Sequence, residues 1–160
     1  CWSLVGSEMC IRDRSIPTVC AINGHAFGAG FMFALTHDVR VMREDRGFLC
    51  ANEMQLGLPI PRPELALFKH KIPANAFFET VQLSKRWTGR DALHAGIVQE
   101  LSSFDEMTAV VQRKAEELAP LANNRKNYGH QKEMLFGERA AINQIDGPAH
   151  MLKHSEDFNA

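Results

Sequence analysis

The chain has 160 residues, of which 45% are hydrophobic and 23% charged, and its formal net charge is -1. This composition is typical of one soluble globular domain, and the near-neutral charge offers no basic field for nucleic acid or an anionic membrane surface. The longest apolar stretch, residues 26–35, is interrupted by glycines, whereas a membrane-spanning helix needs ~20 apolar residues. We therefore expect a globular protein with no nucleic-acid partner and no membrane partner.

The first residues differ in character from the rest of the chain. Residues 1–14 have neither helical nor strand periodicity, and the chain begins with Cys1 rather than Met. We expect this stretch to be foreign to the domain, as a sequencing or assembly remnant would be, and the remainder to be an N-terminally truncated piece of a longer protein. No C-x-x-C pair is present, so Cys20 and Cys50 are interpreted as small buried hydrophobes in strands.

The first half of the chain predicts short strands around one apolar helix. A β-branched run at residues 18–22 predicts a buried strand that ends at the Asn23-Gly24 turn. A glycine-rich turn then leads into an expected helix over residues 31–36. Alternating residues 38–42 and the run 48–51 predict two further strands, which the charged turn between them would join as a hairpin.

The second half is predicted to be mostly helical. Helix-start and helix-stop signals predict helices over 63–70 and 74–84, a helix from Thr88 to Gly96, a strand over 97–101, and a helix from Ser103 to Pro120. Helical spacing continues from residue 124 to the end. The expected organisation is an α/β core over residues 15–102 followed by a helical region over residues 103–160.

The glycine-rich turn is the first candidate site. Gly28, Ala29 and Gly30 open a buried helix, and unpaired backbone N–H groups at such a turn can bind an anionic oxygen. The pattern matches neither a phosphate-binding P-loop nor a complete dinucleotide fingerprint. The alternative is structural, because small residues also let a helix pack closely on a strand.

Glu53 is the second candidate. It follows an expected buried strand and precedes the apolar loop 54–58. Such surroundings desolvate a carboxylate and raise its pKa toward the range of a general base. The alternative is an ordinary solvated loop glutamate.

Residues 16–30, IPTVCAINGHAFGAG, together with His37-Asp38, Asn52-Glu53-Met54-Gln55-Leu56-Gly57-Leu58 and ALHAGIV at 92–98, stand in a characteristic order. This combination resembles the crotonase (enoyl-CoA hydratase/isomerase) superfamily over about residues 15–119. The resemblance implies a partial spiral of ββα units followed by a helical C-terminal region. It also implies an acyl-CoA thioester substrate, with coenzyme A as part of the substrate and no separate cofactor.

In that family two backbone N–H groups form an oxyanion hole for the thioester oxygen. The resemblance places one of them at Ala29, flanked by Gly28 and Gly30. Hydratases of the family use two glutamates, and the earlier of their positions falls here among Phe31, Met32 and Phe33. The resemblance is therefore closest to the Δ3,Δ2-enoyl-CoA isomerases of fatty-acid β-oxidation, in which one glutamate, here Glu53, moves the proton.

An apolar pocket of Phe27, Phe31, Met32 and Leu58 would keep water from the conjugated product. Two alternatives to an isomerase stay open. One is a hydratase or another crotonase-type acyl-CoA enzyme, and the other is a non-catalytic crotonase-like assembly module. Because the family's N-terminal strands have no counterpart here, we expect the chain as written to be inactive. The intact protein is expected to be a homotrimer or a dimer of trimers.

The remaining polar residues favour structural interpretations. His25 is interpreted as a structural donor, and His150 and His154 lack an evident third metal ligand, so no metal site is expected. Lys126, Lys132 and Arg139 are expected to be solvated on the surface rather than bound to coenzyme A phosphates. Localisation would be cytoplasmic in a bacterium and peroxisomal or mitochondrial in a eukaryote, which the sequence does not decide.

Overall fold

The computed structural model describes residues 11–12, 14–135 and 144. Strands and helices alternate first and helices follow, which confirms the expected α/β class with a helical C-terminal part. In chain order the elements are β1 (Val19–Ile22), β2 (Ala26–Phe27), α2 (Ala29–Leu35), β3 (Val39–Arg43), β4 (Leu49–Cys50), the 3₁₀ turn η1 (Met54–Leu56), α3 (Arg62–Lys71), α4 (Ala74–Val81), α5 (Gly89–His94), β5 (Glu100–Ser102), α6 (Met107–Leu118), the 3₁₀ segment η2 (Ala119–Asn124) and α7 (Arg125–Leu135).

Two small parallel sheets organise the strands of the described residues. One has the order β1-β3-β5, and the other pairs β2 with β4. The expected hairpin of β3 and β4 is therefore wrong, because these consecutive strands belong to different sheets. The helix α2 carries the chain back over the first sheet so that β3 lies parallel to β1, with Val19 opposite Val39. A crossover of this kind is what parallel pairing requires.

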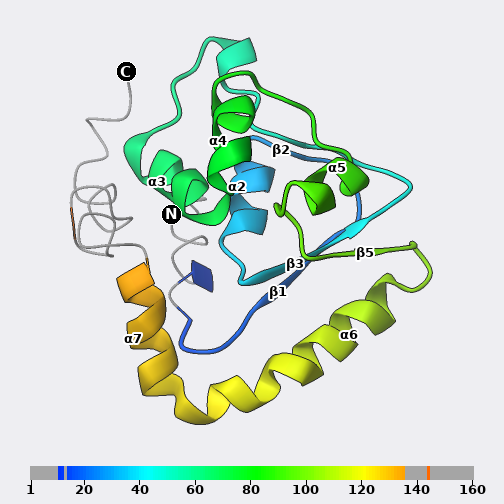
Figure 1. The fold of residues 1–160 in the computed structure, drawn as a ribbon, viewed down its shortest axis with the longest axis vertical. Coiled ribbons are helices and arrows are strands. Elements are labelled where there is room, and N and C mark those ends of the chain that lie inside the picture. The colour runs from blue at the N-terminus through cyan, green and yellow to red at the C-terminus, as the bar shows by residue number, and fades with distance from the viewer. Residues whose placement is uncertain (1–10, 13, 136–143, 145–160) are drawn as a thin grey trace, which may run out of the picture.

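Helices cover both sides of the first sheet. Figure 1 shows α6 running along β1 and β3, while α2, α3 and α4 gather on the other side. The core lies between that helical group and the strands, where the fully buried rings of Phe31 and Phe68 meet edge to face with centroids 5.4 Å apart. Aromatic pairs favour this geometry because the positive ring edge faces the negative ring face.

Most predicted helix boundaries are confirmed to within a few residues. Thr88 caps α5, since its Oγ1 accepts a hydrogen bond from the N–H of Asp91 at 3.2 Å. α6 ends at Leu118, just before Pro120. The last strand begins at Glu100 rather than at Ile97, because the N–H of Ile97 bonds back to Ala92 O at 2.8 Å and so completes the turn after α5.

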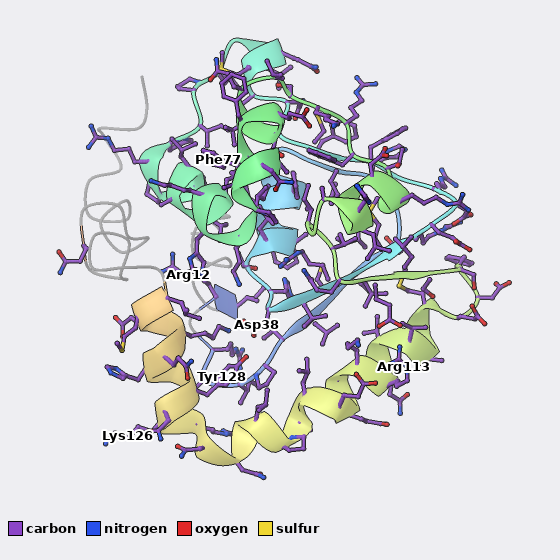
Figure 2. The ribbon with its side chains drawn as sticks, viewed as in Figure 1. Arg12, Asp38, Phe77, Arg113, Lys126 and Tyr128 are labelled. Carbon is purple, nitrogen blue, oxygen red and sulfur yellow. The ribbon has the colours of Figure 1, made fainter. Side chains whose placement is uncertain are left out.

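Lys132 is not the solvated surface residue that the sequence predicts. Its side chain is only 8% exposed, and its Nζ lies 3.0 Å from Oδ2 of Asp38, so it is an ion-paired structural residue. In Figure 2 Tyr128 lies on the side of α7 that faces Asp38, whereas Lys126 points outward from α7. Arg139, His150 and His154 lie outside the described residues. Within the described part of the chain, no helix has both the length and the apolar character needed to cross a bilayer.

Candidate active site

Parallel pairing of β2 with β4 brings the two candidate segments together. Phe27 stands opposite Cys50, and the N–H of Gly28 donates to Cys50 O at 2.9 Å. Paired parallel strands end at the same edge of their sheet. The glycine turn after β2 and the segment that leads from β4 to Glu53 therefore leave the sheet side by side.

Gly28 occupies a conformation that favours glycine, and a carboxylate uses the space that a side chain would fill. Its φ is 49° and its ψ is -118°. A Cβ placed on Gly28 would lie 3.1 Å from Oε1 of Glu53 and 3.4 Å from Oδ1 of Asn52. Both the strained φ and the close carboxylate argue for glycine at this position. Glycine at position 28 thus leaves room for the Glu53 carboxylate at the start of α2.

The N-terminus of α2 is open to solvent. Ala29 and Gly30 are exposed, whereas the N–H groups of Phe31 and Met32 bond to the carbonyl of Gly28 at 2.9 Å and 3.0 Å. The N–H groups of the first helical residues have no acceptor inside a helix. Ala29 is the first residue of α2, so its N–H is one of the groups for which the helix itself supplies no acceptor.

A tight turn holds the Glu53 backbone. The carbonyl of Glu53 accepts hydrogen bonds from the N–H groups of Leu56 at 3.0 Å and Leu58 at 2.9 Å. Gly57, with φ 71°, closes the turn in the left-handed region. The Glu53 side chain is half-buried, and its Oε2 is buried without a hydrogen-bond partner. A buried carboxyl oxygen without a hydrogen-bond partner is unusual in a folded protein and calls for an explanation.

The four expected pocket residues lie in different environments. Phe31 and Met32 are core residues, at 0% and 6% exposure, whereas Leu58 is 54% exposed. Phe27 is half-buried, with the ring of His25 at 5.8 Å and the guanidinium carbon of Arg86 at 5.7 Å from its ring. Phe31 and Met32 thus support α2 from behind, and only Phe27 and Leu58 present accessible apolar surface.

Sequence reasoning missed a buried acid, Glu64. It lies in the first turn of α3, is 8% exposed, and has a buried Oε2 without a hydrogen-bond partner. Burial raises the pKa of Glu64, and the charge of Glu53 raises it further. An acid in the first turn of a helix is common because it complements the helix dipole. The sequence pattern therefore carried no functional signal.

No metal centre is found in the described residues, where no group of three or more His, Cys, Asp and Glu side chains could hold an ion. One described cavity, of about 250 Å³, lies elsewhere, between the approach to β1 and the junction of α6 with η2. Its lining residues are Ile16, Pro17, Val19, Ala115, Leu118, Ala119, Ala122 and Arg125. None of them belongs to the glycine turn or to the Glu53 loop.

Sequence comparison relates the chain to acyl-CoA enzymes. The family model described as enoyl-CoA hydratase/isomerase matches residues 6–156, a match that begins inside the segment 1–14. Enoyl-CoA delta isomerase 3 of Arabidopsis thaliana is 36% identical over 132 residues, which cover 80% of this chain and 55% of the relative. The peroxisomal enoyl-CoA delta isomerase 2 of the same plant is also 36% identical, over 82% of this chain and 56% of its own length. The chain thus spans about half the length of these curated relatives.

Other similar proteins carry different activities in their names. A carnitinyl-CoA dehydratase of Salmonella typhi is 32% identical over 70% of this chain and 44% of its own length. A solved probable enoyl-CoA hydratase of Mycobacterium tuberculosis has a TM-score of 0.74 at 24% identity, covering 96% of this chain and 65% of that one. A second structure of the same mycobacterial protein, described there as an enoyl-CoA isomerase, has a TM-score of 0.79 at 23% identity, covering 94% of this chain and 66% of that one. These two structures establish a shared fold.

Proposed function

Because the chain belongs to the enoyl-CoA hydratase/isomerase family, we propose that its protein is an enoyl-CoA isomerase that shifts the double bond of a 3-enoyl-CoA to the 2-position. The observation that carries this proposal is the position of the Glu53 carboxylate beside the glycine turn, where Oε1 lies 3.1 Å from the place that a Cβ on Gly28 would take. A base and an N–H donor then stand next to each other at the open start of α2.

In the proposed reaction Glu53 removes a proton from C2 of the thioester. The negative charge passes to the thioester oxygen, which accepts a hydrogen bond from Ala29 N–H. Glu53 then returns the proton at C4, so one carboxylate serves both carbons. A positioned donor of this kind typically contributes ~10²–10³ in rate, because it stabilises charge that develops only in the transition state.

Two observations favour isomerisation over hydration. No residue of α2 between Ala29 and Leu35 carries a carboxylate, so the earlier glutamate of a hydratase has no counterpart on this helix. Curated relatives at 36% identity are named enoyl-CoA delta isomerases. Hydration remains the second candidate for two reasons. One relative is named a carnitinyl-CoA dehydratase, and the buried Glu64 supplies a second carboxyl group of the kind that hydration uses. A role in fatty-acid β-oxidation, an acyl-CoA partner and assembly as a homotrimer or a dimer of trimers belong to the same proposal.

The test is an assay of the full gene product with 3-enoyl-CoA and, separately, with 2-enoyl-CoA. We expect isomerisation of the first to exceed hydration of the second, and Glu53→Gln to lower isomerisation at least ~100-fold, as general-base catalysis predicts. Glu44→Gln, at an exposed turn position, is the matched control and should leave the rate unchanged. Dominant hydration, or an active Glu53→Gln variant, would overturn the proposal.

A further inference from the structure

The helix α7 is attached to the rest of the structure through a lysine rather than through an apolar face. Of its eleven residues, all of which the structure describes, only Lys132 is buried. The side chains of Met134 and Leu135 are 66% and 60% exposed. Lys132 Nζ donates to Oδ2 of Asp38 at 3.0 Å and to the carbonyl of Arg14 at 3.3 Å. Surface helices usually dock through an apolar stripe, so docking that centres on one lysine is unusual and can be weakened by one substitution.

The carboxylate that receives this lysine is fixed to the first sheet. Asp38 Oδ2 also accepts hydrogen bonds from the N–H and the Oγ1 of Thr18, both at 2.9 Å, and the N–H of Asp38 donates to Thr18 Oγ1 at 3.1 Å. The next residue, Val39, begins β3 and pairs with Val19 of β1. These contacts do not involve α7. Removal of the lysine should therefore loosen α7 without loosening the sheet.

The segment before α7 has the features of a hinge. The elements α6, η2 and α7 follow one another directly, and η2 is a 3₁₀ stretch that contains Pro120. A 3₁₀ stretch inside a longer helical run often marks a hinge, and proline removes one N–H from the backbone hydrogen bonds. The helix α7 has its own start, since Oδ1 of Asn124 accepts a hydrogen bond from the N–H of Asn127 at 3.3 Å. Figure 1 shows that α7 runs in a different direction from α6.

The described cavity of about 250 Å³ lies at this hinge. Ala119 and Ala122 of η2 line it together with Arg125, the first residue of α7. A close-packed interior resists movement, whereas a cavity leaves neighbouring segments room to shift. Movement of α7 about η2 would therefore displace part of the cavity wall.

We propose that α7 is a hinged arm, which turns about η2 and is latched onto the first sheet by the Asp38–Lys132 pair. In the latched state Tyr128 lies on the side of α7 that faces Asp38 (Figure 2). Release uncovers Asp38, carries Arg125 away from the cavity and leaves α7 as a short helix without packing. Helices of this length are marginal in water, so the backbone N–H groups of the released arm exchange with solvent. Such local opening needs less free energy than global unfolding.

The first test is hydrogen–deuterium exchange of the full gene product, measured by mass spectrometry on peptides from α7 and from β3. Lys132→Met should speed exchange in α7 at least ~10-fold, because it removes a hydrogen bond between charged groups, and should leave β3 unchanged. Lys126→Met, at an exposed lysine of the same helix, is the control and should change neither element. An α7 that does not respond to Lys132→Met would overturn the proposal, as would equal acceleration of α7 and β3.

A second test separates release of the arm from fraying within the helix. A Cβ on Gly129 would lie 3.2 Å from the Cβ of Ser15, a few tenths of an ångström short of the spacing of about 3.5–4.5 Å in a disulfide. Ser15→Cys combined with Gly129→Cys should therefore join α7 to the segment before β1 when oxidised. In this locked protein Lys132→Met should no longer speed exchange in α7, and reduction of the disulfide should restore its effect. The same acceleration in the locked and the reduced protein would place the effect of Lys132 inside the helix and overturn the proposal.

Discussion

Oε1 of Glu53 lies 3.1 Å from the position that a Cβ on Gly28 would take, so the carboxylate lies where a side chain at position 28 would crowd it. The geometry follows from the parallel pairing of Phe27 with Cys50, after which both segments leave the sheet together. This relationship explains why Gly28 is required for structure and for the position of Glu53 at the same time.

Replacing Gly28 should be costly, whereas replacing the neighbouring Gly30 should not. Gly28→Ala forces a side chain into a sparsely populated backbone conformation with positive φ, at a cost of roughly 1–3 kcal/mol, and displaces Glu53. A Cβ on Gly30 would meet only the Cβ of Ala26, at 3.8 Å, and Gly30→Ala should stabilise the helix by ~0.5–1 kcal/mol. Urea unfolding and isomerase assays of both variants measure the expected differences in stability and activity. Equal stability and activity of the two variants would contradict it.

The Asp38–Lys132 ion pair should contribute to stability. Asp38 Oδ2 accepts from Lys132 Nζ and from both the N–H and the Oγ1 of Thr18. Asp38→Asn leaves a buried ammonium group without its counter-charge, and breaking a buried pair in this way costs about 3 kcal/mol. Lys132→Met should cost less, because it removes the buried charge as well.

Lys126→Met is the matched control for this pair, since Lys126 is an exposed lysine of the same helix. It should change the free energy of unfolding by less than about 0.5 kcal/mol. Urea denaturation measures the loss in free energy of unfolding, which should be largest for Asp38→Asn, smaller for Lys132→Met and smallest for Lys126→Met. A Lys126→Met variant as unstable as Asp38→Asn would show that the contribution comes from the helix and not from the pair.

The buried indole of Trp87 should depend on Thr80. Its Nε1 donates to Oγ1 of Thr80 at 3.0 Å, and that hydroxyl donates to Ala76 O at 2.8 Å. Thr80→Val keeps the shape but leaves a buried N–H without an acceptor, which costs ~1–3 kcal/mol. Thr108→Val, at an exposed position, is the control. Thermal unfolding compares them, and an unchanged midpoint for Thr80→Val would refute the dependence.

The free energy of unfolding should decrease on mild acidification, because the buried imidazole of His70 resists protonation in the folded chain. Burial, followed by the charges of Lys71 and Arg12, lowers the pKa of His70 from 6.5 to about 4. Between these two values the unfolded chain binds a proton that the folded chain does not, so stability decreases as the pH falls from about 6.5 to about 4 and levels off below. The free energy of unfolding across this pH window measures the effect.

His70→Gln should flatten that pH dependence, because the group that takes up the proton in the unfolded chain is gone. His37, whose pKa burial also lowers, should leave a smaller slope of the same sign. His130→Gln, at an exposed position on α7, is the control and should keep the full slope. An unaltered slope in His70→Gln would assign the pH dependence to other groups.

Local patterns predicted the helices well. Thr88 and Pro120 mark ends that depend on hydrogen bonds within a few residues, and such bonds can be anticipated from neighbouring residue types. The predicted hairpin of β3 and β4 is wrong because strand pairing depends on residues far apart in the chain. Alternation and a charged turn are compatible with a hairpin, but the partner of each strand lies far away in the chain, at β1 for one and β2 for the other.

Single charged side chains also show this difference between what neighbouring residues determine and what distant segments determine. Lys132 and Glu64 both occupy helical positions that are compatible with solvent exposure, yet both are buried. The carboxylate that pairs with Lys132, that of Asp38, is supplied by a distant segment. A pattern of residues on one helix contains no information about what another helix or loop brings to it.

The sequence by itself determined the family, the helical second half, and the pairing of a glycine turn with Glu53 as candidate site, because these depend on residue types in a specific order. Only the tertiary structure decided that Glu53 lies beside Gly28, that Phe31 and Met32 belong to the core, and that Glu64 is buried. Those outcomes depend on parallel strand pairing and helix packing between remote segments, and no local pattern specifies such contacts.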